Sequence, residues 1–335
     1  MYNSIITGTG YYVPENIVTN DDLSKLMDTS DAWIQERTGI QQRHFATRGK
    51  DTTTSMGVRA AQMAMEKAKI NKEDIDFLIF ATLSPDYYFP GCGVLAQKEL
   101  GLHTVGALDI RNQCSGFIYA LSVADQFIKT GMYKNVLVIA SEMQSPALDL
   151  TTRGRNMAVL FGDGAGAAVL SRSEENGKGI LSSHLHSEGA HAEELAILTP
   201  GVGKKWVTDL LKENDPEDTS YFPYMNGQFV FKNAVVRFSE VIIEGLKANK
   251  LTESDINLFI PHQANLRISQ FIQQKFNLPD AKVFNNIQKY GNTTAASIAI
   301  ALAEAVEQDR IKENDIILLA AFGSGFTWGS VVIKW

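Results

Sequence analysis

Hydrophobic and polar positions alternate along the chain between helix-like and strand-like patterns, and one order of patterns occurs twice. In each copy an amphipathic helix pattern precedes a short apolar run, and a second apolar run follows later. The helix patterns lie at 58–69 and 241–250, the first runs within 70–81 and 251–262, and the second runs at 135–141 and 315–321. Because the landmarks recur about 180 positions apart, we predict two similar halves, 1–175 and 176–335.

The character of these runs predicts the fold class. They are short and rich in β-branched residues, which is typical of strands buried on both faces of a mainly parallel sheet. Two helix patterns, 114–130 and 292–308, are apolar over most of their circumference. Helices that apolar belong in a buried middle layer. We therefore expect an α/β fold with a duplicated unit and five layers in the order α/β/α/β/α.

The segment 187–226 interrupts the pattern with charged, proline-bearing and glycine-bearing sequence. We interpret it as an excursion from the core between the two halves. A flexible linker is the alternative. Its aromatic residues indicate that parts of it pack, and these residues are Trp206, Tyr221, Phe222 and Tyr224.

Composition narrows the class of protein. The 335 residues are 44% hydrophobic and 21% charged, which suits one large domain or two fused domains. The net charge of −7 argues against a nucleic-acid partner. No run approaches the ~20 apolar residues of a membrane span, and the N-terminus lacks a signal-peptide pattern. We expect a cytoplasmic protein with no membrane partner.

Cys114 is the first candidate for chemistry. It lies where a short apolar run ends and an apolar helix pattern begins, so the sequence predicts a thiol at a helix N-terminus. Unpaired N–H groups and the helix dipole favour thiolate there, and we expect a lowered pKa and a nucleophile. The alternative is a small buried residue, because free cysteine is among the most buried residue types.

Two more segments extend this candidate site. His262 follows an apolar run directly, and Asn292 directly precedes a helix pattern. Cys, His and Asn together form a candidate catalytic set. The glycine-rich segment 321–329 follows the strand predicted at 316–319 and can aim backbone N–H groups at a developing oxyanion, although an ordinary turn is the alternative.

Other motifs give weaker evidence of function. Gly8 and Gly10 lack the third glycine of a dinucleotide fingerprint, so we interpret them as turn glycines. The glycine-dense segment 161–170 is interpreted as a tight turn that leads into a buried strand. His184 and His186 can share a strand face, but no third ligand of suitable spacing lies nearby, and we expect no metal.

The combined motifs resemble those of β-ketoacyl-acyl-carrier-protein synthase III, a family of the thiolase superfamily. The resemblance runs from residue 7 to the C-terminus, and the duplicated five-layer fold is also that family's. The segments that carry it are Asn-Gln-Cys-Ser-Gly-Phe at 112–117, Phe-Gly-Asp-Gly-Ala-Gly-Ala at 161–167, Pro-His-Gln-Ala-Asn at 261–265, Tyr-Gly-Asn-Thr at 290–293 and Phe-Gly-Ser-Gly-Phe-Thr-Trp-Gly at 322–329.

The resemblance implies a decarboxylative condensation. Cys114 takes an acyl group from a coenzyme A thioester. His262 and Asn292 bind the thioester carbonyl of a malonyl-carrier substrate and stabilise the enolate that forms as carbon dioxide leaves. Backbone N–H groups of Cys114 and Ser324 hold the tetrahedral oxyanion. Coenzyme A enters as part of a substrate, so no separate cofactor is expected.

The resemblance also implies binding residues. Trp33, Arg37 and Arg153 match residues that contact the adenine and phosphate groups of coenzyme A. Without the family, Arg37 is better interpreted as a surface ion-pair residue. Asn265 matches a residue of the pantetheine tunnel, Arg267 matches a contact to acyl carrier protein, and Phe89 matches a residue that crosses a dimer interface to close the partner's acyl pocket. A homodimer is therefore expected.

Several alternatives remain open. The condensing enzyme initiates fatty-acid synthesis or serves a specialised pathway, and the polar sequence at 111–113 and the long 187–226 segment put the acyl substrate in doubt. A Cys-His-Asn thioester hydrolase uses the same residue types. A catalytically silent acyl-binding protein is the third alternative. A hydroxymethylglutaryl-type synthase needs a carboxylate base, and no glutamate lies in a motif that marks that role.

Overall fold

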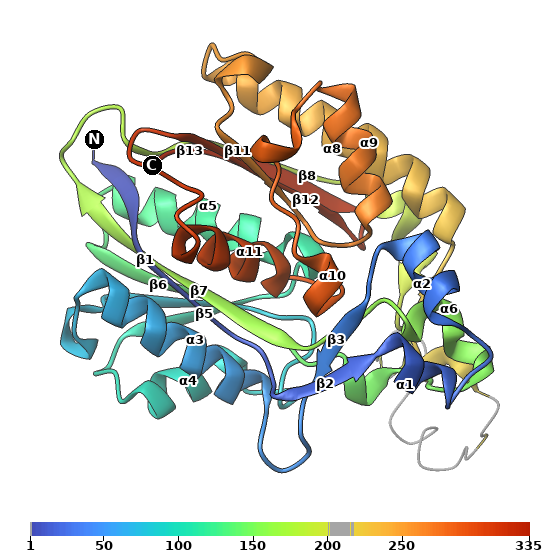
Figure 1. Ribbon diagram of the computed structural model, residues 1–335. Coiled ribbons are helices and arrows are strands. Elements are labelled where there is room, and N and C mark those ends of the chain that lie inside the picture. Colours follow the sequence, from blue (N-terminus) through green and yellow to red (C-terminus); the bar gives the residue numbers. More distant parts are fainter. Residues whose placement is uncertain (1, 200, 202–214, 216–217) are drawn as a thin grey trace.

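The computed structural model describes residues 2–199, 201, 215 and 218–335, and two sheets organise them (Figure 1). The first sheet has the strand order β1-β7-β6-β4-β5. Its strands are β1 (Asn3–Tyr12), β4 (Phe77–Ala81), β5 (Gly106–Ile110), β6 (Asn135–Glu142) and β7 (Gly164–Ser173). The second has the order β11-β12-β13-β8, with β8 (Gly179–Ser187), β11 (Leu258–Pro261), β12 (Ile316–Gly323) and β13 (Thr327–Lys334).

The two strand orders correspond. Read from β8, the order β8-β13-β12-β11 matches β1-β7-β6-β4. An isolated parallel bridge between Phe259 and Val283 takes the place that β5 has in the first sheet. The repeated sequence runs lie at matching places, since 70–81 leads into β4 and 251–262 leads into β11. The repeat seen in the sequence therefore extends to the topology.

Longer helices complete the five layers, as Figure 1 shows. Helices α3 (Thr53–Ala68) and α4 (Cys92–Leu100) cover the outer face of the first sheet, and α8 (Gly227–Ala248) and α9 (Leu266–Lys275) cover that of the second. Helices α5 (Gly116–Lys129) and α11 (Ala296–Glu307) lie between the sheets in one apolar cluster with strands of both. The predicted buried middle layer is observed.

Short elements surround this core. They are the strands β2 (Asn16–Thr19), β3 (Gln42–Phe45), β9 (Leu195–Ala196) and β10 (Tyr224–Met225), and the helices α1 (Asn20–Ser24), α2 (Asp31–Thr38), α6 (Arg155–Ala158) and α10 (Ile287–Tyr290). Strands β9 and β10 pair, so the described ends of the 187–226 segment pack, as its aromatic residues indicated. Trp206 lies outside the described residues. No helix within the described part of the chain is long and apolar enough to cross a membrane.

The prediction of mainly parallel sheets is wrong, because both sheets are mixed. Parallel pairs are β4–β5, β4–β6 and β11–β12, whereas β1–β7, β6–β7, β12–β13 and β13–β8 are antiparallel. Helix layers cover both faces of each sheet, and that burial makes the strands apolar whatever their direction.

The interpretation of Gly8 and Gly10 as turn glycines is also wrong. Both lie inside strand β1, where α3 packs closely. A Cβ on Gly8 would lie 2.2 Å from the carbonyl oxygen of Ala64, and one on Gly10 would lie 2.3 Å from that of Ala60. The segment 161–170 leads into buried strand β7, as predicted. There a Cβ on Gly166 would lie 2.5 Å from the Cβ of Ala299, so glycine allows α11 to approach.

Candidate active site

The structure places Cys114 at the entrance to α5. The thiol lies in a 3-10 turn, Gln113–Ser115, and the α-helix begins at Gly116, two residues later than predicted. The end of β12 lies against it, since a Cβ on Gly323 would lie 2.7 Å from the Cβ of Cys114. Gln113 has a φ of 39°, a left-handed conformation that is strained for a side chain of this size. Strain beside a nucleophile is typical of functional sites.

Burial, rather than the helix, dominates the ionisation of Cys114. It raises the pKa of the thiol to about 12, with the Glu142 carboxylate as the second cause. The backbone N–H groups of Cys114 and Ser324 act in the opposite direction, because they donate toward the sulfur. The predicted lowering of the pKa is therefore wrong for the resting site. The two N–H groups are the pair to which the family resemblance assigns the oxyanion hole.

His262 lies directly after β11, with its ring buried. Its backbone N–H donates to the carbonyl of Ala320 at 2.8 Å, which ties it to β12. Nδ1 and the Ser297 hydroxyl are 2.6 Å apart, while Nε2 has no hydrogen-bond partner among the described residues. Burial lowers the pKa of the imidazole to about 3, so the ring is neutral at physiological pH. A neutral ring with one committed nitrogen leaves the other for substrate.

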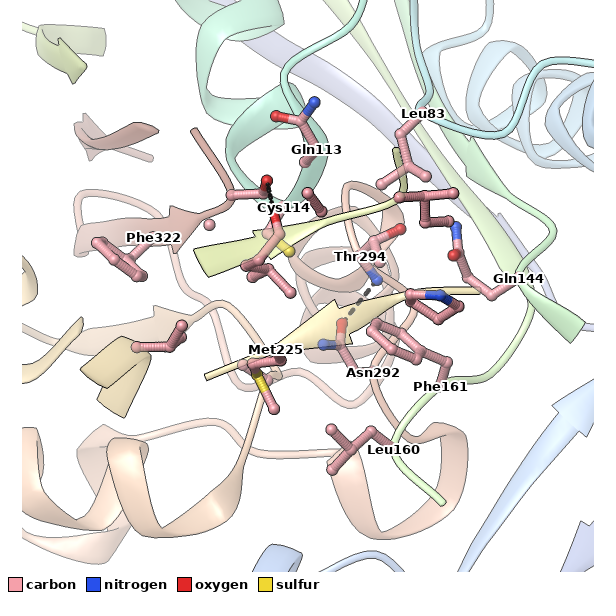
Figure 2. A pocket seen from close by; sticks show the side chains of 18 of the residues that line it. Leu83, Gln113, Cys114, Gln144, Leu160, Phe161, Met225, Asn292, Thr294 and Phe322 are labelled. Atoms are coloured by element: carbon pink, nitrogen blue, oxygen red, sulfur yellow. Dashed lines mark hydrogen bonds between the residues drawn. The ribbon is translucent and has the colours of Figure 1, made fainter. Parts of the chain in front are cut away.

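Asn292 does not head α11, because that helix begins at Ala296. Its backbone instead bridges to the first half: its N–H donates to Leu160 at 2.8 Å, and its carbonyl accepts from Gly162 at 3.1 Å. The side-chain oxygen accepts from the backbone N–H of Thr294 at 2.8 Å (Figure 2). This bond turns the amide nitrogen toward other partners, so Asn292 offers N–H donors beside the cavity.

A carboxylate that the sequence analysis missed lies in the same site. Glu142 ends β6 and is fully buried. It accepts hydrogen bonds of 2.7 to 3.4 Å from the side chains of Thr82, Ser84 and Gln144 and from the backbone N–H groups of Leu83 and Ala295. Burial raises the pKa of Glu142 to about 7 despite these bonds. A charged residue directly after the apolar run 135–141 was the signal that could have found it.

One cavity of about 610 Å³ lies at the centre of the site, with Glu142 buried behind its wall. Cys114, His262, Asn292 and Ser324 all contribute to its wall, although they come from four separate parts of the sequence. Figure 2 shows Gln113 and Leu83 on one side of Cys114, and Leu160 and Met225 on the opposite side. The described ends of the 187–226 segment also line it, through residues such as Leu195, Ile197 and Tyr221.

The predicted coenzyme A residues lie on α2 and near α6. Ser30 accepts from the N–H of Trp33 and caps α2, and residues four apart on a helix share a face. The Arg37 guanidinium accordingly lies 4.5 Å from the centre of the Trp33 ring. Arg155, which the sequence analysis missed, lies 4.9 Å from the same ring. Arg37 also meets Glu36 at 3.4 Å, so the ion-pair interpretation holds too.

The remaining predicted residues are dispersed around the site. Arg153 forms an ion pair with Asp149 at 2.7 Å. Asn265 lines the cavity and donates to the carbonyl of Arg37 at 2.9 Å, so it joins the cavity to α2. Arg267 is exposed in the first turn of α9. Phe89 is 81% exposed, outside the cavity wall of this single chain.

The two histidines of strand β8 both contact the carboxylate of Glu244. His186 Nε2 lies 2.6 Å from one oxygen of Glu244, and His184 Nδ1 lies 3.4 Å from the other. Among residues whose positions the structure describes, no three His, Cys, Asp or Glu side chains gather as a metal ion requires.

Comparison with known proteins identifies the family. Residues 108–189 match the family model of 3-oxoacyl-[acyl-carrier-protein] synthase III, and residues 246–335 match the model of its C-terminal part. The β-ketoacyl-[acyl-carrier-protein] synthase III of Caldanaerobacter subterraneus subsp. tengcongensis is 46% identical over 98% of this chain and 97% of its own. The chain belongs to the β-ketoacyl-[acyl-carrier-protein] synthase III family. It is an acyltransferase that condenses an acyl group with a malonyl unit, as the sequence predicted.

Solved structures agree with this β-ketoacyl synthase III assignment. The crystal structure of 3-oxoacyl-[acyl-carrier-protein] synthase III from Aquifex aeolicus is 44% identical, with a TM-score of 0.90 over 99% of this chain and all of that chain. The priming β-ketosynthase of the R1128 polyketide pathway is 31% identical, with a TM-score of 0.88 over 99% of this chain and 96% of that chain. The thiolase-like fold is confirmed. Relatives of this fold serve more than one pathway.

Proposed function

We propose that this enzyme transfers an acyl group from coenzyme A to Cys114 and condenses it with malonyl-acyl carrier protein to initiate fatty-acid synthesis. The observation that carries the proposal is the meeting of the Cys114 thiol, two backbone N–H donors, the free Nε2 of His262 and the amide of Asn292 at one cavity. Trp33, Arg37, Arg153 and Arg155 supply cationic and aromatic groups for coenzyme A, and Arg267 supplies an exposed cation for the carrier protein.

In the first half-reaction the thiol must lose its proton, because its pKa is far above neutral. His262 Nε2 takes this proton as the sulfur attacks the thioester carbonyl, and the N–H groups of Cys114 and Ser324 stabilise the oxyanion. One such donor contributes about 3 kcal/mol. The tetrahedral intermediate expels coenzyme A thiolate, which takes the proton back from the ring. An acyl group remains on Cys114.

In the second half-reaction the malonyl unit loses carbon dioxide, and its electron pair becomes an enolate. His262 Nε2–H and the Asn292 amide donate to the enolate oxygen. The carbanion then attacks the acyl-cysteine carbonyl and releases the Cys114 thiolate. His262 needs its Nε2 as acceptor in one step and as donor in the next. The Ser297 hydroxyl can donate or accept, so it accommodates either tautomer.

We also propose that the enzyme is a homodimer built from subunits with halves 1–175 and 176–335. Strand β5 ends the first sheet, and an open edge offers unpaired backbone groups. Beside it, Tyr87, Tyr88 and Phe89 are 57%, 72% and 81% exposed. Adjacent exposed aromatic rings favour a protein interface. The cytoplasmic location expected from the sequence stays a prediction.

Intact-protein mass spectrometry tests the proposal. Wild type and Cys114→Ala are incubated briefly with acetyl-coenzyme A and longer esters, before and after malonyl-acyl carrier protein is added. We expect an acyl mass on wild type alone, which malonyl-carrier discharges as a β-ketoacyl product. An adduct that only hydrolyses supports the hydrolase alternative. The absence of any adduct supports a silent acyl-binding protein, and either result rejects the proposed function.

A further inference from the structure

The cavity wall on the strand side of Cys114 carries three polar side chains among apolar ones. Strands β4, β6 and β5 are parallel neighbours, so their carboxyl ends meet at one edge of the sheet. The residues just beyond these ends form what we call the strand-end wall, which consists of Leu83, Pro85, Tyr88, Arg111, Gln113 and Gln144. Two amides and a guanidinium therefore face a cavity that accepts an acyl chain.

The direction of substrate entry assigns this wall to the acyl group. Asn265 lies at the α2 end of the cavity, next to the candidate coenzyme A residues. Leu160 and Met225 pack in one apolar cluster with Ile34 and Trp33 of α2. They lie on one side of Cys114, and Leu83 and Gln113 lie on the other (Figure 2). A thioester that enters from the α2 end thus places its acyl chain beyond Cys114, against the strand-end wall.

Gln144 is the residue of the strand-end wall whose hydrogen bonding a polar ligand would complete. It is 6% exposed, and its backbone N–H donates to Asp163 at 2.6 Å, which fixes the loop. The side-chain nitrogen donates to Glu142 at 3.3 Å. Glu142 has a pKa of about 7, and in its ionised form it only accepts, so the amide nitrogen of Gln144 faces the ionised carboxylate and the amide oxygen points elsewhere. The side-chain oxygen of Gln144 has no partner among the described residues, and an alkyl chain against it would leave it unsatisfied.

Arg111 and Gln113 add donors to the same wall. Neither side chain has a hydrogen-bond or ion-pair partner within the described part of the chain, and both line the cavity. In the single chain Arg111 is exposed and Gln113 is half-buried, so the wall becomes more open there than at Gln144. An arginine fork binds carboxylates well.

We propose that the acyl primer of this enzyme carries an oxygen function, a hydroxyl or a carboxylate, which Gln144, Gln113 and Arg111 bind at the strand-end wall. The inference rests on the proposed function, because it takes the acyl group to be held on Cys114. A hydroxyl satisfies the oxygen of Gln144, and a carboxylate satisfies Arg111. A plain alkyl chain satisfies neither, which costs it about tenfold or more in rate against a matched oxygenated chain.

Rates of Cys114 acylation test this inference. The probes are butyryl-, 3-hydroxybutyryl- and succinyl-coenzyme A, which share a four-carbon acyl group, and acetyl-coenzyme A is the reference for the thiol itself. We expect at least one oxygenated ester to acylate wild type about tenfold faster than butyryl-coenzyme A. Gln144→Leu, which keeps the side-chain size, should abolish a preference for the hydroxyacyl ester. Arg111→Met should abolish a preference for the succinyl ester.

Two results overturn the inference. One is butyryl transfer as fast as both oxygenated esters in wild type, a comparison that needs no variant to fold. The other is a preference that survives both Gln144→Leu and Arg111→Met. If the acetyl ester labels Cys114 and malonyl-carrier discharges it, the proposed function stands while the primer inference fails. If no ester labels Cys114, the proposed function itself fails.

Discussion

Glu142 makes the stability of this enzyme depend on pH in a direction opposite to that of most carboxylates. Burial raises its pKa from the ordinary value of 4.5 to about 7, so the folded protein holds a proton that the unfolded chain releases. Stability from this group is complete below the unfolded pKa. It decreases as the pH rises toward the folded pKa, because the unfolded state then binds fewer protons than the native state.

The magnitude follows from the two pKa values. Each tenfold change in proton affinity corresponds to about 1.4 kcal/mol, so the free energy of unfolding should decrease by about 3 kcal/mol between about pH 4 and about pH 8 through Glu142. Glu142→Gln removes the titration. It also replaces an acceptor of several hydrogen bonds with an amide, which adds a cost that does not change with pH.

Urea unfolding at fixed protein concentration measures this effect. The quantity is the difference in unfolding free energy between wild type and Glu142→Gln, determined at about pH 5 and at about pH 8. We expect wild type to lose about 2 to 3 kcal/mol relative to the variant over this interval. Glu73→Gln, at an exposed position, is the matched control and should show no such difference. A constant difference between wild type and Glu142→Gln would refute the argument that burial controls this carboxylate.

Three further predictions concern the catalytic groups. The first is alkylation of Cys114 by iodoacetamide, followed by peptide mass spectrometry. Because burial raises the thiol pKa to about 12, the alkylation rate should increase about tenfold per pH unit from about pH 7 to about pH 10. A rate that levels off near neutral pH would contradict this. Gly323→Ala should slow acylation of Cys114 about 10²-fold or more, because the added Cβ would lie 3.1 Å from the Cys114 backbone nitrogen and displace the oxyanion donors. An unchanged acylation rate argues against an oxyanion hole at this position. Ser297→Ala should slow carbon dioxide release from malonyl-carrier about fivefold or more, because His262 loses its hydrogen bond to the hydroxyl. Ser297→Thr keeps a hydroxyl and is the conservative control. Equal rates in wild type and Ser297→Ala would reject a role of Ser297 in positioning His262.

Local sequence signals located the three principal catalytic candidates. Three residues separate Cys114 from the end of an apolar run, at the start of a helix pattern, and His262 stands directly after another apolar run; each position places a side chain near the carboxyl end of a buried strand, where α/β sites form. The glycine-rich segment 321–329 likewise indicated a turn whose backbone N–H groups could face an oxyanion, and the family resemblance assigned that role to Ser324. Repeated patterns at a constant spacing also predicted the paired halves and the buried central helices.

Local signals failed where the answer depends on neighbours distant in sequence. The helix N-terminus predicted a lowered thiol pKa, but burial and Glu142 outweigh it, and both effects come from other parts of the chain. Arg155 reaches the Trp33 ring only because α6 folds against α2. Mixed strand directions escaped prediction because covering helices make every buried strand apolar.

The sequence by itself thus determined which side chains are available for chemistry and which strand or helix end carries each one, because these properties depend on short-range pattern. Only the tertiary structure decided which of them share a cavity, which protons they hold and how polar the acyl wall is. Those properties depend on desolvation and on distances between segments such as 142–144, 292–297 and 323–324. No local pattern encodes such distances.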